Sequence, residues 1–150
     1  MLKRVLAPLA TLTALTAGLL AAPQAQATVS PGNAALDWAE AHATGHPFAF
    51  GGAGPITYDC SGAVMAAYAH ADGIMLPHNT VAMVDSGLLV RTTHPQRGDI
   101  AMWGPVDAPS HAGFVTGWPD IAFGAENIGI RVGWYSWQYW PPTAFYTVHP

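Results

Sequence analysis

The chain of 150 residues contains a single cysteine, Cys60, in the stretch YDCSGAVMAAYAH, where a loop is expected to turn into a helix. The first turn of a helix leaves backbone N–H groups unpaired and carries the positive end of the dipole, and both effects favour a thiolate. The charge of the adjacent Asp59 opposes them, unless its carboxylate caps the helix. Cys60 is therefore a candidate nucleophile, and a buried, inert thiol is the alternative.

A thiolate nucleophile needs a base that later returns a proton to the leaving group, and this base is usually histidine. His111 opens the stretch SHAGFVTG, where a polar residue enters an apolar strand whose small residues Ala112 and Gly113 allow a substrate backbone to approach. For the other histidines we expect surface or structural roles. They are His42, His46, His70, His78, His94 and His149. The sequence therefore makes His111 the candidate base for Cys60.

The elements that must position this pair fall into two groups. Helical spacing predicts a helix in NAALDWAEAH, with Asn33 as its N-cap and Gly45 after its end. A second helix is predicted over CSGAVMAAYAHADG, with Gly73 as its stop, and a loop with a short helix over residues 74–90. Five short strands between turns are then predicted, in DIAMW, AGFVTG, DIAFGA, IRVGWY and AFYTVHP. Helices followed by strands indicate an α+β domain with an antiparallel sheet.

The first 27 residues have the features of a cleaved signal peptide. Lys3 and Arg4 precede an apolar stretch over residues 5–22, and the triplet AQA ends at Ala27. A membrane anchor is the alternative, since the apolar stretch is almost long enough to span a bilayer. We expect cleavage after Ala27, which leaves a secreted domain of residues 28–150 with no membrane association.

The mature chain is acidic and nearly without cations. It has three arginines and no lysine against nine acidic residues, which is a net charge of −6 with histidine neutral. Binding to nucleic acid or to an anionic membrane surface needs clustered basic residues, so we expect neither. Its length suits one small domain, which must fold without an intramolecular disulfide because only one cysteine is present.

Four stretches in order carry a resemblance to a known family: GHPFAFGG, YDCSGAVMAAYAHADGIMLPHNT, RGDIAMWG and SHAGFVTG. Together they resemble the NlpC/P60 family of cysteine peptidases, which shows G-x-P-Y-x-W-G-G, D-C-S-G, L-P-R, P-G-D-L-V-F-F and H-V-G-I-Y. The resemblance covers about residues 33 to 132. It implies a papain-like α+β fold, with N-terminal helices packed on a five- to six-stranded antiparallel sheet. It also implies hydrolysis of peptidoglycan stem peptides, commonly between D-glutamate and the diamino acid.

The resemblance assigns roles to residues of this chain. Cys60 matches the nucleophile and His111 the base. Asp59 and Ser61 match positions that, in family members, help to hold the free amino terminus of the stem peptide.

Two substrate-binding positions depart from the family pattern. Phe48 occupies the place of the family tyrosine in the glycine loop, and it cannot donate a hydrogen bond. His78 replaces the arginine of L-P-R. We expect both side chains to contact substrate in this chain.

The third catalytic residue is not evident. The family has a polar residue about a dozen places after the histidine, but counting from His111 reaches Phe123 and Gly124. Glu126 and Asn127 are the nearest polar candidates, with Glu126 preferred, and a Cys–His dyad without a third member is the other option.

The sequence therefore predicts a secreted, cell-wall-associated cysteine endopeptidase that acts as a monomer on peptidoglycan stem peptides, with no cofactor and no metal. A non-catalytic wall-binding domain on the same scaffold is one alternative, and a related amidase or acyltransferase is another.

Overall fold

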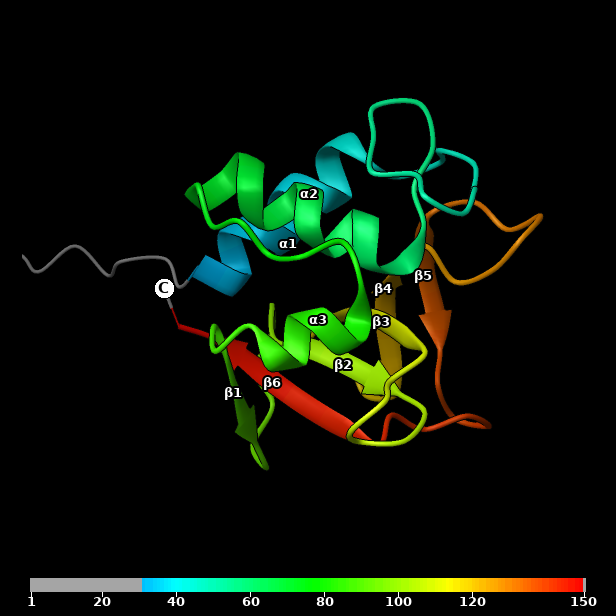
Figure 1. Ribbon diagram of the computed structural model, residues 1–150. Coiled ribbons are helices and arrows are strands. Elements are labelled where there is room, and N and C mark those ends of the chain that lie inside the picture. Colours follow the sequence, from blue (N-terminus) through cyan, green and yellow to red (C-terminus); the bar gives the residue numbers. More distant parts are fainter. Residues whose placement is uncertain (1–30, 150) are drawn as a thin grey trace, which may run out of the picture.

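The computed structural model describes residues 31–149, which form three helices followed by six strands (Figure 1). The helices are α1 (Pro31–His42), α2 (Cys60–Asp72) and α3 (Thr80–Asp85). In Figure 1, α1 and α2 lie together above the sheet, and α3 lies beside β1. The predicted signal peptide, residues 1–27, lies outside the described residues. Within residues 31–149, no helix combines the length and the apolar character needed to cross a membrane.

The strands form one antiparallel sheet in the order β1-β6-β2-β3-β4-β5. Their bounds are β1 (Leu89–Thr92), β2 (Ile100–Trp103), β3 (His111–Val115), β4 (Ile121–Gly124), β5 (Gly133–Ser136) and β6 (Ala144–Val148). The five predicted strands are confirmed with small shifts of their ends, and β1 is an additional edge strand. The α+β class and the antiparallel sheet are therefore as predicted.

Both faces of the central strands are covered, because every residue of β2 and β3 is buried. The larger core lies between the helices and one face of the sheet, and it includes Leu36, Tyr68 and Phe114. A smaller aromatic cluster covers the opposite face around Trp103 and includes Tyr135 at its margin. His111 pairs directly with Trp103 across β2 and β3, so it shares this second face.

The ends of the helices follow local rules, with one correction. Asp59 caps α2 by accepting a hydrogen bond from the Gly62 N–H, and Gly73 ends α2 in the left-handed conformation. The prediction of Asn33 as the N-cap of the first helix is wrong, because α1 already includes Pro31. Proline is favoured in the first turn, where its missing N–H would have no partner inside the helix.

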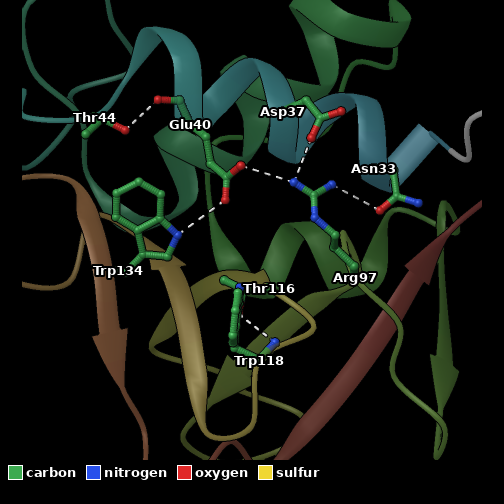
Figure 2. Close-up of polar contacts among 8 residues, drawn as sticks. All are labelled: Asn33, Asp37, Glu40, Thr44, Arg97, Thr116, Trp118 and Trp134. Carbon is green, nitrogen blue, oxygen red and sulfur yellow. Dashed lines mark hydrogen bonds and ion pairs between the residues drawn. The ribbon is translucent and has the colours of Figure 1, made fainter.

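A polar cluster ties α1 to the sheet (Figure 2). Arg97, in the loop before β2, donates hydrogen bonds to Asp37 at 2.6 Å, to Glu40 at 3.1 Å and to Asn33 at 3.3 Å. The indole N–H of Trp134 on β5 donates to the other oxygen of Glu40 at 3.3 Å. The cluster is partly exposed, so its main effect is to fix the position of α1 rather than to add much stability.

Candidate active site

Cys60 and His111 come from different layers of the fold and line one cleft of about 350 Å³. Cys60 is the first residue of α2, and His111 is the first residue of β3. The cleft is lined by Phe48, Phe50, Cys60, Ser110, His111, Glu126, Asn127 and Trp140. Packing of α2 on β3 therefore brings together the two residues that the sequence pairs as nucleophile and base.

The Cys60 thiol is partly buried, and burial raises its pKa above the ordinary value. The charge of Asp59 raises it further, while hydrogen bonds from the backbone N–H groups of Ala112, Ser61 and Cys60 itself act in the opposite direction. Because burial is the largest effect, the resting group is a thiol at neutral pH. The Ala112 N–H also places the sulfur beside the residue that follows His111.

The His111 imidazole is 5% exposed and sits among aromatic rings. The ring centroids of Trp103, Trp140 and Tyr135 lie 4.9, 5.5 and 5.8 Å from its own. This burial lowers the pKa of His111 to about 4. His111 is therefore a neutral imidazole at neutral pH, which can accept a proton from a neutral thiol.

The hydrogen-bond partner of His111 Nε2 is the Tyr135 hydroxyl, at 2.9 Å. Glu126 and Asn127, the predicted third member and its alternative, line the cleft instead, and their hydrogen bonds do not include this nitrogen. The sequence did not point to Tyr135, because the candidates considered after His111 extended only to Asn127. Tyr135 lies 24 residues after His111 on β5, where an aromatic side chain is typical of any strand and does not indicate a site.

Asp59, next to Cys60 in the chain, binds the glycine loop and the first turn of α2 through its carboxylate. Its Oδ1 accepts hydrogen bonds from the Gly62 N–H at 2.7 Å and the Ser61 hydroxyl at 3.2 Å, and lies 2.8 Å from His78 Nε2. Its Oδ2 accepts from the Gly51 N–H at 2.7 Å. The carboxylate is buried and, like Ser61 and His78, does not line the cleft.

The glycine loop before α2 forms one wall of the cleft. Phe48 and Phe50 pack edge to face at 5.2 Å and both line the cavity. The loop is held to α2 at Gly62, where an added Cβ would lie 1.9 Å from the carbonyl oxygen of Gly52. The glycine of the D-C-S-G motif is therefore required for this close approach.

The remaining histidines of the helical layer lie at a separate cavity of about 440 Å³ behind the glycine loop. His42 and His70 each stack on Trp38, at centroid distances of 4.8 and 4.6 Å. In the described part of the chain, no group of three or more His, Cys, Asp or Glu side chains could hold a metal ion.

Comparison with known families and curated proteins agrees with this geometry. Residues 45–146 match the family model described as the NlpC/P60 family, so the chain belongs to that family. It is 31% identical over 127 residues to a probable endopeptidase of Corynebacterium glutamicum, covering 83% of this chain and 58% of the relative. It is 42% identical over 73 residues to a probable endopeptidase of Mycobacterium tuberculosis, covering 49% of this chain and 18% of the relative. The chain therefore spans less than two thirds of these curated relatives.

Solved structures share the papain-like α+β fold. The NlpC/P60 domain of the peptidoglycan hydrolase SagA superposes with a TM-score of 0.70 at 25% identity, covering 78% of this chain and 98% of that domain. RipD of Mycobacterium tuberculosis, described as a non-catalytic NlpC/P60 protein adapted to peptidoglycan binding, superposes with a TM-score of 0.63 at 19% identity. The superposition covers 81% of this chain and 98% of the RipD chain. The same fold therefore occurs in a peptidoglycan hydrolase and in a protein described as non-catalytic.

Proposed function

We propose that this chain is a cysteine endopeptidase that hydrolyses peptidoglycan stem peptides, with Cys60 as nucleophile and His111 as base. The observation that carries the proposal is the position of the Cys60 sulfur, at a helix start, beside the backbone of β3 and in the same cleft as His111. The family membership and the relatives named as endopeptidases support the peptide bond as the target.

The chemistry proceeds from a neutral pair. His111 takes the thiol proton as the sulfur of Cys60 bonds to the substrate carbonyl carbon, and the carbonyl oxygen becomes an oxyanion. The Cys60 N–H, which has no carbonyl acceptor inside the helix because it lies in the first turn of α2, would stabilise that oxyanion. The imidazolium then gives its proton to the leaving amine as the C–N bond breaks, and water, deprotonated by His111, hydrolyses the thioester.

Glu126 sets the charge of the cleft. Among the described residues that line it, Glu126 is the one charged side chain, since His111 is neutral. A carboxylate without a neighbouring cation attracts an ammonium group and repels a carboxylate. We therefore expect a stem peptide with a free amine beside the scissile bond, and the family suggests the bond between D-glutamate and the diamino acid.

Export and a monomeric state complete the proposal. The leader over residues 1–27 has the sequence features of a signal peptide, which would deliver the domain to the cell wall. There it would act on the wall without a cofactor.

Defined muropeptides test the function directly. Purified wild-type protein should convert a stem peptide to two fragments whose masses, measured by mass spectrometry, identify the bond that is cut. Failure to cut any muropeptide, with or without its glycan, would contradict the proposal.

A non-catalytic wall-binding role is the second candidate. It is favoured by the uncharged state of Cys60 and His111 and by the shared fold of RipD. Titration of the same muropeptides by calorimetry separates the two functions, because a binding domain gives saturable heats with no new fragments.

A further inference from the structure

We propose that Tyr135 is the positioning residue of the catalytic pair and takes the place that a third polar residue after the histidine occupies in other family members. This proposal rests on the proposed function. The contact that carries it is the 2.9 Å hydrogen bond between the Tyr135 hydroxyl and His111 Nε2. It explains how a chain with no polar side chain at the expected place can still orient its imidazole.

The sheet order shows how the phenol reaches His111. Strand β4 lies between β3, which carries His111, and β5, which carries Tyr135. Neighbouring strands are about 4.8 Å apart, so only a long side chain can cross the intervening strand. Gly124, the last residue of β4, lies beside the phenol and has no side chain to block its path.

Two glycines form the space that the hydroxyl occupies. A Cβ added to Gly113, two residues after His111, would lie 2.2 Å from the Tyr135 hydroxyl oxygen, which is far inside contact distance. A Cβ added to Gly124 would lie 3.9 Å from the same oxygen and 3.5 Å from the Gly113 Cα. The phenol therefore fills a gap that the absence of a side chain at Gly113 creates.

The proposed role of His111 as base requires one form of the imidazole, in which the Tyr135 hydroxyl oxygen accepts from Nε2. A base directed at Cys60 needs a lone pair on the ring nitrogen that Tyr135 does not contact, which is Nδ1. His111 must then carry its proton on Nε2 and donate it to the Tyr135 oxygen. Without that acceptor, the buried ring could adopt the other form, in which Nδ1 holds the proton and cannot act as a base.

A phenol is a different partner from a carboxylate. Burial raises the pKa of Tyr135 well above its ordinary value, so the hydroxyl is neutral throughout the working range. A neutral partner orients the imidazole without stabilising its charged form, which fits the lowered pKa of His111. Tyr135 thus acts on the geometry and the tautomer of the base.

Tyr135→Phe tests the proposal, because it removes the hydroxyl and keeps the ring. The readouts are the ¹⁵N spectrum of the His111 ring in the intact protein and the steady-state kinetics on a defined muropeptide. We expect the wild type to show the Nε2–H tautomer and the variant to show a mixture, with kcat lowered roughly tenfold and KM little changed. Tyr139→Phe, at a tyrosine that is 94% exposed, is the matched control and should leave both readouts unchanged.

Gly113→Ala disturbs the hydrogen bond between Tyr135 and His111 without changing either residue. The added methyl should displace the Tyr135 hydroxyl and reproduce the tautomer mixture although the tyrosine is still present. An Nδ1–H tautomer in the wild type, or an unchanged ring spectrum in Tyr135→Phe, would overturn the proposal. The spectrum does not depend on turnover, so a tautomer change in a protein that cuts no muropeptide would contradict the proposed function and leave the positioning role supported.

Discussion

Cys60 and His111 meet in the cleft as uncharged groups, because burial acts on both. It raises the pKa of the thiol and lowers that of the imidazole to about 4, so proton transfer to an ion pair is disfavoured in the resting protein. In the proposed mechanism, the thiolate then forms only as substrate is attacked. A fast reaction of the free protein with electrophiles is consequently not a required sign of an enzyme here.

Alkylation of Cys60 by iodoacetamide should follow this charge state. At neutral pH we expect a rate below that of a free model thiol, rising with pH to beyond the ordinary thiol pKa of about 8.5, because only the thiolate reacts. Mass spectrometry of the labelled protein gives the rate at each pH. A fast plateau below pH 7 that disappears in His111→Ala would instead show a thiolate–imidazolium pair.

Either Glu126 or Asp59 can supply the carboxylate for the substrate amine, and substitution of each separates the two. If Glu126 receives the ammonium, acetylating that amine should lower kcat/KM about tenfold in the wild type and have little effect in Glu126→Gln. Asp59→Asn is the matched comparison, because it keeps the cap and loses the charge. If only Asp59→Asn loses the preference for the free over the acetylated peptide, Asp59 and not Glu126 binds the amine.

The sequence pairs Cys60 with His111, which lie in one cleft, but it does not indicate that Tyr135 contacts His111. Cys60 and His111 were found because a helix start and a strand start are local signals. Tyr135 has no such signal, since its role depends on strand order and on an empty position at Gly124. The burial of Asp59 is hidden in the same way, because its partners include the distant His78.

At the scale of elements, the junction of the glycine loop with α2 holds Cys60 in place. The Asp59 N–H donates to the Gly52 carbonyl at 2.8 Å, and its carboxylate joins the loop to the first turn of the helix. The packing depends on Gly62, which lies against Gly52. Any side chain at that position must move the loop, and with it the wall of the cleft.

Gly62→Ala tests this junction. The added Cβ would lie 1.9 Å from the Gly52 oxygen, so we expect the free energy of unfolding to fall by about 1 to 3 kcal/mol or more, despite the better helix propensity of alanine. Urea denaturation measures the change. Gly133→Ala is the control, because its nearest neighbour would lie 3.9 Å away. Equal stability of wild type and Gly62→Ala would show that the loop is not held at this point.

The elements themselves were largely predictable because their signals are local. Gly73 marks the end of α2, and short apolar runs between turns mark five strands. The edge strand β1 was not predicted, because its apolar residues Leu89 and Val90 fall at the end of residues 74–90, where a loop and a short helix were expected, and the polar Arg91 and Thr92 do not continue the apolar run. The helix start was placed at Asn33, but α1 already begins by Pro31, and the Asn33 side chain accepts a hydrogen bond from the distant Arg97.

For the molecule as a whole, the buried neutral histidine links stability to acidity. The unfolded chain protonates His111 near pH 6.5, whereas the folded protein does so near pH 4. The stability that the protein has with His111 neutral is therefore complete above pH 6.5 and is lost as the pH falls towards 4. The loss is about 3 kcal/mol at 1.36 kcal/mol per pH unit.

Urea denaturation at several pH values compares the wild type with His111→Gln. The wild type should lose more stability than the variant between pH 6.5 and 4, because other titrating groups are common to both proteins. Parallel stability curves would contradict the low pKa of His111.

Catalysis by Cys60 is tested by comparing the wild type with Cys60→Ala. Wild type and Cys60→Ala are incubated with a defined muropeptide, and both cleavage by mass spectrometry and binding by calorimetry are recorded. We expect the wild type to cut the peptide, while Cys60→Ala binds it with similar affinity and leaves it intact. Cleavage by Cys60→Ala, or binding without cleavage by the wild type, would show that Cys60 is not a catalytic nucleophile.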